Sequence, residues 1–147
     1  MNVTTRQGTL EDIPGVFELV KELAIFERAL DQVSNTVDRM KQDYDNKLYD
    51  FFVAENEEKI IGLSLYYFRY STWKGKRLYM EDIIVTEAMR GHGIGKLLFD
   101  ATVQAAHDTH CTGMMWQVLD WNISAVGFYR KYGTRFDDEW VNCNLDF

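Results

Sequence analysis

The segment Arg90–Lys96 has the sequence RGHGIGK and limits the possible folds of this chain more than any other segment. Its three glycines alternate with other residues directly before the apolar run Leu97-Leu98-Phe99. The preceding stretch, Arg77–Val85, is typical of a strand, and helical spacing follows at Ile94, Leu97, Leu98, Ala101 and Ala105. We therefore expect a strand, a glycine loop and a helix N-terminus, an arrangement whose N–H groups and helix dipole can hold phosphates.

Two familiar phosphate-binding loops do not fit this segment. The P-loop pattern GxxxxGK[ST] needs one more residue between Gly91 and Gly95, and Leu97 stands where the hydroxyl ligand of magnesium should be. The dinucleotide pattern GxGxxG needs its third glycine one position later and repeated βαβ units with a ribose-binding acid. A loop that holds phosphates only as a handle suits coenzyme A, and the basic residues of the segment add positive charge.

The rest of the chain alternates between helix-like and strand-like patterns. Helices are predicted from Leu10 to Phe26, from a cap at Ser34 or Thr36 to about Asp45, and from Asn122 or Ser124 to about Tyr132. Strands are predicted at Val3–Arg6, Asp50–Glu55, Lys59–Tyr70, Arg77–Val85, Met114–Leu119 and Trp140–Leu145, with a turn at Asn56-Glu57-Glu58. This order predicts an α+β fold with helices on the faces of a mixed, largely antiparallel sheet.

Composition narrows the class of protein. The chain has 147 residues, of which 46% are hydrophobic, and this predicts a single domain spanning residues 1–147. A net charge of -7 argues against a nucleic acid partner and favours cationic ones. Residues 1–6 lack signal-peptide character and the apolar stretches are too short to span a membrane, so we expect a cytoplasmic protein with no membrane partner. Cys111 and Cys143 form no CxxC pair, and we expect both to be reduced.

Two motifs carry a resemblance to a known family. Arg90-x-x-Gly93-x-Gly95 resembles the R/Q-x-x-G-x-G/A loop of the GNAT N-acetyltransferases, and the run Asn122–Gly133 resembles their N-x-x-A-x-x-F-Y-x-K-x-G signature. Within that family, the chain most resembles the diamine (spermidine/spermine) N-acetyltransferase branch. Five short segments carry this resemblance: ELAIFE from residue 22, DQV from 31, YYF from 66, WKGK from 73 and LYMED from 78. The chain departs from that branch in a reduced segment between Asp45 and Phe51 and in little sequence after the last predicted strand, which leaves the substrate open.

The resemblance implies a fold, a co-substrate and an assembly. The GNAT acyl-CoA N-acyltransferase fold has a mixed, mostly antiparallel sheet of about six or seven strands with about four flanking helices. Acetyl-CoA is the implied acetyl donor, without a metal, and a homodimer is the implied assembly. The implied cofactor-binding residues are Ile83, Ile84, Val85, Arg90, Gly91, His92, Gly93, Ile94, Gly95, Lys96, Asn122, Ser124 and Ala125.

Acetyl transfer to an amine needs a base for the amine and a proton for the leaving thiolate. The resemblance implies that Tyr129 protonates the thiolate of coenzyme A. Glu81 is the candidate base, acting through water, and Asp82 and Glu27 could attract a second ammonium. Neighbours in a regular strand point to opposite faces, so Glu81 and Asp82 share one pocket only if a bulge turns one of them. Trp73 either bounds an aliphatic amine or covers the sheet.

Other polar clusters are weaker candidates. His107, His110 and Cys111 suggest a zinc site, but no fourth ligand is apparent, and the two histidines fall near a predicted helix C-terminus, which favours imidazolium. We therefore expect no metal.

Three functions fit these observations. The first is an acetyl-CoA-dependent acetyltransferase for a small cationic amine, such as a polyamine, a diamine or a lysine-like amino acid. The second is a GNAT enzyme for a peptide or protein amine, and the third is a catalytically idle module that binds coenzyme A. The presence of Tyr129 and Glu81 argues against the third, and the acidic residues weakly favour the first.

Overall fold

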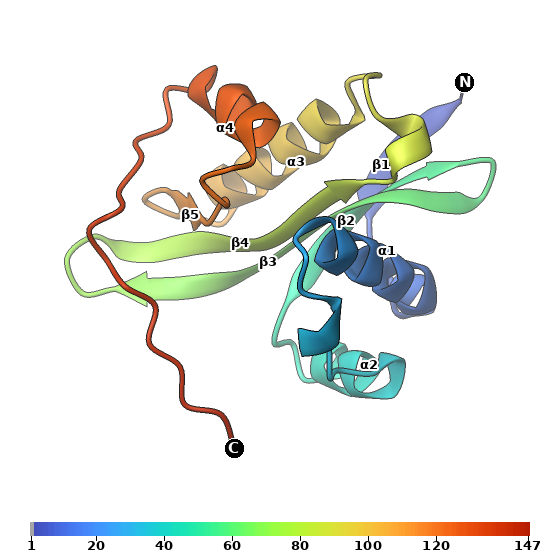
Figure 1. The fold of residues 1–147 in the computed structure, drawn as a ribbon, viewed down its shortest axis with the longest axis horizontal. Coiled ribbons are helices and arrows are strands. Elements are labelled where there is room, and N and C mark those ends of the chain that lie inside the picture. The colour runs from blue at the N-terminus through green and yellow to red at the C-terminus, as the bar shows by residue number, and fades with distance from the viewer. Residues whose placement is uncertain (1) are drawn as a thin grey trace. The chain divides into compact units, whose positions relative to one another are not determined.

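Residues 2–147, which the computed structural model describes, form five strands, four α-helices and three short 3-10 helices (Figure 1). The strands are β1 (Val3–Gln7), β2 (Asp50–Asn56), β3 (Lys59–Ser71), β4 (Gly75–Val85) and β5 (Met114–Trp116). The α-helices are α1 (Ile13–Phe26), α2 (Val37–Asp45), α3 (Ile94–Asp108) and α4 (Ile123–Arg130). The chain divides into two compact units, one ending at Gln117 and one running from Val118 to Phe147.

The first unit contains the whole sheet, in the order β1-β2-β3-β4-β5. All neighbouring strands are antiparallel except β4 and β5, which are parallel. The α+β fold with a mixed, mostly antiparallel sheet is therefore confirmed, although the sheet has five strands rather than about six or seven. Thr36 caps α2 as expected, since its side chain accepts a hydrogen bond from the N–H of Arg39.

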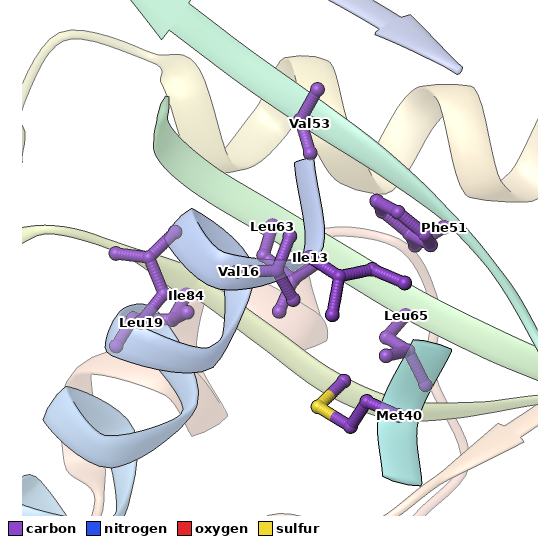
Figure 2. Packing of buried hydrophobic residues seen from close by; sticks show 9 residues of the cluster. All are labelled: Ile13, Val16, Leu19, Met40, Phe51, Val53, Leu63, Leu65 and Ile84. Atoms are coloured by element: carbon purple, nitrogen blue, oxygen red, sulfur yellow. The ribbon is translucent and has the colours of Figure 1, made fainter. Parts of the chain in front are cut away.

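Helices cover both faces of the sheet in the first unit (Figure 1). On one face, side chains of α1 and α2 pack with β2, β3 and β4 into a core, which Figure 2 shows as side chains pointing toward one another. Helix α3 covers the other face, where Leu98 packs on Ala54 and Ile61. The buried hydroxyls of Ser64 and Thr102 are 2.6 Å apart and link β3 to α3, so neither is left without a hydrogen bond.

The second unit differs from the sequence-based expectation in one element. The helix starts as expected, because the side chain of Asn122 caps α4 by accepting from the N–H of Ala125. The predicted strand at Trp140–Leu145 is wrong: these residues are in no strand, and Trp140, Val141 and Leu145 are exposed. Alternating apolar residues favour a strand, but a strand also needs a neighbour for its backbone hydrogen bonds, and none pairs with this segment among residues 2–147.

Two further expectations concern the whole chain. Cys111 and Cys143 are both free, as expected. Within residues 2–147, no helix combines the length and the apolar composition that crossing a membrane requires.

A close approach at Gly8 fixes the core beneath α2. Gly8 is buried and its N–H donates to the carbonyl of Phe51, whose ring fills the space where a side chain at Gly8 would lie. The same ring packs on Tyr44 and Tyr49, with centroids 5.6 and 6.1 Å away. Gly8 thus allows the aromatic contacts that hold the end of α2 on the sheet.

We expect Gly8→Ala to lower the free energy of unfolding by roughly 1–3 kcal/mol, because the added methyl group overpacks a buried ring. Gly127→Ala is the control, since a Cβ there meets nothing within 4 Å and alanine favours a helix. Urea unfolding of both variants measures the difference. A loss no larger in Gly8→Ala than in the control would contradict the close packing at Gly8.

Candidate active site

A bulge in β4 brings two carboxylates to one pocket. Leu65 pairs with Asp82 but the next residue, Tyr66, pairs with Met80, so Glu81 is an extra residue in β4. Glu81 and Asp82 both line a pocket of about 190 Å³. The bulge expected as the condition for a shared pocket is therefore present.

The other walls of this pocket, which we call the acidic pocket, come from α1, α2, β3 and the adjoining loops. They are Phe17, Val20, Asn35, Met40, Asp43, Tyr49 and Leu65. The hydroxyl of Tyr49 donates to the carbonyl oxygen of Met40, 2.7 Å away, and this hydrogen bond ties the start of β2 to α2. Asp43 adds a third carboxylate, on α2, to the lining that Glu81 and Asp82 form on β4.

One carboxylate of the acidic pocket is costly to ionise. Burial, and then the negative charges of Glu81 and Glu27, raise the pKa of Asp82 from 3.8 to about 7. Glu27 therefore lies close enough to Asp82 to affect its ionisation, as a shared substrate site would require. A pocket in which a carboxylate is difficult to ionise is one that a bound cation would stabilise.

Tyr67 fixes the orientation of Glu81. Its hydroxyl donates to Oε1 of Glu81, 3.1 Å away. Burial, and then the charge of Glu81, raises the pKa of Tyr67 to about 12, so Tyr67 keeps its proton and remains a donor near neutral pH. Sequence reasoning missed Tyr67, although its alternation with Leu65 in a hairpin would have placed it on the same face.

The edge of β4 beside the bulge is open on the side of β5. The two strands pair only from Leu78 to Met80 of β4, and within residues 2–147 no strand pairs with this edge beyond Met80. The side chains of Ile83 and Ile84 are used in packing, Ile84 in the core with α1 and Ile83 toward α3. The backbone of the segment ending at Val85 therefore has no partner strand on this side within the described residues, and its binding of pantetheine stays a prediction.

The glycine loop fits a ligand that approaches the backbone closely. Gly91 and Gly93 have φ values of 83° and 77°, a region that favours glycine, and a Cβ at either position would meet nothing within 4 Å. Crowding within the chain therefore does not require these glycines. Gly93 is the N-cap of α3 and has no side chain to cap the first N–H groups of the helix. Exposed N–H groups at a helix N-terminus fit the pyrophosphate of coenzyme A.

Basic residues of the loop lie at defined positions. The Nε of Arg90 donates to the carbonyl oxygen of Val85 at 2.9 Å, and its guanidinium lies 5.5 Å from the ring centroid of Phe26. Lys96 forms an ion pair with Asp100 at 2.6 Å, and His92 is exposed. The loop is thus held at its start by contacts with β4 and α1, while His92 and Lys96 are exposed.

Glu22 of α1 is a second residue that sequence reasoning did not assign. Its carboxylate accepts hydrogen bonds from the hydroxyl of Thr86, at 3.0 and 3.1 Å, and from the N–H of Glu87, at 3.0 Å. These bonds fix the segment between β4 and the glycine loop to α1. Glu22 begins the segment ELAIFE, which contributes to the family resemblance, but the resemblance implied no role for Glu22.

The second unit holds the remaining candidates. Tyr129 lies in α4 and is buried, with its ring centroid 5.5 Å from that of Phe128. Ser124 is exposed, and the side chain of Asn122 is used as the cap of α4. Each of these residues is described within its own unit.

Two other candidates lie outside the acidic pocket. Trp73 is 82% exposed in the turn between β3 and β4, and it is not in the pocket lining. His107 falls in the last turn of α3, and His110 follows that helix. Among residues 2–147, no three histidine, cysteine or acidic side chains gather as metal ligands would.

Comparison with known proteins decides the family. The model of the acetyltransferase (GNAT) family matches residues 17–134. This chain belongs to the GNAT family. It is 34% identical to thialysine N-epsilon-acetyltransferase of Bos taurus over 90% of this chain and 84% of that protein. It is also 35% identical to spermidine/spermine N(1)-acetyltransferase-like protein 1 of Homo sapiens, over 87% of this chain but 20% of that longer protein.

The fold comparison agrees with the family assignment. A crystal structure of an aminoglycoside acetyltransferase from an uncultured soil metagenomic sample superposes with a TM-score of 0.82, covering 99% of this chain and 96% of that one. The two sequences are 19% identical, so this likeness concerns the fold alone. The GNAT chain is thus an N-acetyltransferase, and its family uses acetyl-CoA, as the sequence motifs predicted.

We expect Asp82→Asn to raise the free energy of unfolding near pH 8 by about 1–3 kcal/mol and to change it much less near pH 4. The folded protein holds a proton on Asp82 up to about pH 7, whereas a carboxyl with the ordinary pKa of 3.8 releases it much earlier. The contribution of Asp82 to stability is therefore greatest below about pH 4 and is lost as the pH rises to about 7.

Urea unfolding at both pH values measures this effect. Asp31→Asn, at an exposed position outside the pocket, is the control for the loss of one negative charge and should have little effect. The same change at both pH values in Asp82→Asn would contradict a carboxylate that is costly to ionise.

Proposed function

We propose that this GNAT enzyme transfers the acetyl group of acetyl-CoA to a primary amine of a small cationic molecule, directly and in a ternary complex. The observation that carries the proposal is the acidic pocket, in which the bulge of β4 places Glu81 beside Asp82. Both relatives named above are acetyltransferases whose names specify amines, thialysine in one case and spermidine or spermine in the other.

The charge of the pocket supports a cationic substrate. Burial, and then the like charges of Glu81 and Glu27, raise the pKa of Asp82 to about 7. An ammonium group in the pocket reduces this repulsion, so binding of a cation and ionisation of Asp82 favour each other. A neutral molecule would leave the carboxylates without such compensation.

The donor side of the site combines backbone and charge. When bound, acetyl-CoA supplies an acetyl group activated as a thioester. The N–H groups at the start of α3 and the loop from Arg90 to Lys96 hold its pyrophosphate in this proposal, and the open backbone edge of β4 from Ile83 to Val85 holds its extended arm. Asn122, Ser124 and Ala125 contribute from the start of α4.

Proton transfer is assigned to two residues. Glu81, held by Tyr67, accepts the proton of the amine through water, so that a neutral amine attacks the thioester carbonyl. Tyr129 supplies a proton to the thiolate that leaves. The first role is supported by the hydrogen bond to Tyr67, and the second by the match of Tyr129 to the family signature.

Other features stay predictions. The family match crosses the boundary between the two units, which supports one functional domain over residues 1–147. A homodimer is also proposed, on the resemblance to the diamine acetyltransferases. A role for Trp73 in binding the amine is a further prediction, for a residue that is exposed in the turn between β3 and β4.

A substrate panel tests the proposed function. The panel contains polyamines, diamines, lysine-like amino acids and peptides that carry one amine. We expect thiol release from acetyl-CoA to be fastest with the first three, which are small cationic amines, and slow with the peptides. A preference for the peptides would favour the peptide acetyltransferase. Binding of acetyl-CoA in calorimetry without thiol release for any amine would favour the idle module and overturn the proposal.

Two variants separate the proposed proton transfers. Tyr129→Phe keeps the ring but removes the hydroxyl, so kcat should fall roughly 100- to 1,000-fold while acetyl-CoA affinity changes little. Glu81→Gln should depress kcat/KM most at low pH, where nearly all of the amine is protonated, and a higher pH should partly restore it.

Steady-state kinetics across pH, with calorimetry for acetyl-CoA, measure both effects. The control is Asp31→Asn, which removes a carboxylate at an exposed position outside the pocket. Near-normal kcat in Tyr129→Phe would contradict the assignment of Tyr129 as the proton donor. Parallel pH profiles of kcat/KM for Glu81→Gln and the unmodified enzyme would contradict the assignment of Glu81 as the base.

A further inference from the structure

A row of side chains continues from the acidic pocket along the same face of the sheet. Leu63 and Leu65 of β3 pack into the core with α1 and α2, so alternation along the strand places Tyr67 and Arg69 on that face too. Tyr79 of β4 lies opposite Tyr67, with ring centroids 5.4 Å apart. The row therefore runs from two carboxylates, across two tyrosines, to one arginine.

The guanidinium at the end of this row is available to a ligand. Arg69 is exposed, its Cζ lies 5.7 Å from the ring centroid of Tyr79, and its Nη1 lies 3.1 Å from Sδ of Met115, a weak acceptor. None of the ion pairs found among residues 2–147 involves Arg69. Its neighbour across the ladder, Arg77, instead donates to the carbonyl oxygen of Met114.

The spacing suits a short flexible molecule. Arg69 pairs with Arg77, and at about 3.3 Å per residue the four steps from Arg77 to Glu81 separate these backbone positions by roughly 13 Å. The side chain of Arg69 reaches over the ring of Tyr79, which is two residues closer to Glu81 than Arg77 is. Measured along the strand, the guanidinium is therefore roughly 7 Å from the backbone position of Glu81. This gap is comparable with the aliphatic chain of a diamino acid.

The charges of Glu81 and Arg69 act in opposite directions on the hydroxyl groups of Tyr67 and Tyr79. Burial, and then the charge of Glu81, raise the pKa of Tyr79 and raise that of Tyr67 to about 12. The charge of Arg69 acts on both pKa values in the opposite direction. The row is thus negative at the pocket and positive at Arg69, and a complementary ligand has an ammonium at one end and an anion at the other.

We propose that Arg69 binds the carboxylate of the substrate, and that the preferred substrate is an amino acid with a side-chain amine rather than a diamine or polyamine. This inference rests on the proposed function and selects among its substrates. An arginine offers paired N–H donors that match a carboxylate, and nothing within the described chain occupies them in this way. The second ammonium of a diamine would meet a like charge at the same place.

Two matched pairs of molecules test the inference. Lysine and cadaverine differ by one carboxylate, as do ornithine and putrescine, so kcat/KM for each pair isolates the carboxylate. We expect the unmodified enzyme to favour the amino acid of each pair. Arg69→Gln should lower kcat/KM for the amino acids roughly 10- to 100-fold and raise it for the diamines, and Arg69→Lys should keep part of the preference.

Arg39→Gln is the matched control, since Arg39 is exposed on α2, outside the pocket lining, and its loss changes the net charge equally. Circular dichroism checks that each variant is folded, and calorimetry with lysine and cadaverine gives a readout of binding alone. Equal use of both members of each pair by the unmodified enzyme would overturn the role of Arg69 and leave the proposed function standing. The same slowing of amino acids and diamines by Arg69→Gln would also overturn it. No thiol release with any of the four amines would instead overturn the proposed function, and the inference with it.

Discussion

The pairing of β3 with β4, with one extra residue in β4, is the constraint on which the candidate site depends. Without the extra residue, Glu81 and Asp82 would point to opposite faces of the sheet. With it, both line one pocket, and Tyr67 of the facing strand reaches Glu81. The same strand leaves the pairing with β5 just before the bulge, at Met80, and so exposes backbone groups next to the carboxylates. One local irregularity thus brings the proposed amine site and the proposed acetyl-CoA edge together on β4.

Electrostatics then gives this geometry its selectivity. Burial and like charges raise the pKa of Asp82 to about 7, so its ionisation is costly, and a cation relieves that cost. The positive charge of Arg69 at the other end of the row opposes a second cation and favours an anion. A chain with a net charge of -7 thus carries two paired arginines, Arg69 and Arg77, at the end of this row. Net charge alone could only suggest a cationic partner.

The proposed phosphate site illustrates how a loop can be shaped for a ligand rather than for its own chain. Gly91 and Gly93 have positive φ values, yet no neighbour would contact a side chain at either position. Their conformation is fixed by the anchors before them, where Glu22 holds Thr86 and Arg90 holds the end of β4. Glu22 of α1 and Val85 of β4 lie outside the RGHGIGK segment, so its pattern could not reveal these contacts.

Local patterns determined the family, the order of the elements and the two caps at Thr36 and Asn122, because motifs, periodicity and capping depend on residues that are neighbours in sequence. The same patterns gave a strand at Trp140–Leu145 that does not form, since a strand needs a partner that alternation cannot supply. Only the tertiary structure decided that Glu81 and Asp82 share a pocket and that Arg69 continues the same row. The shared pocket follows from a one-residue shift between β3 and β4, and the place of Arg69 beside it follows from the pairing of these strands. Register is a property of two segments together, not of either one alone.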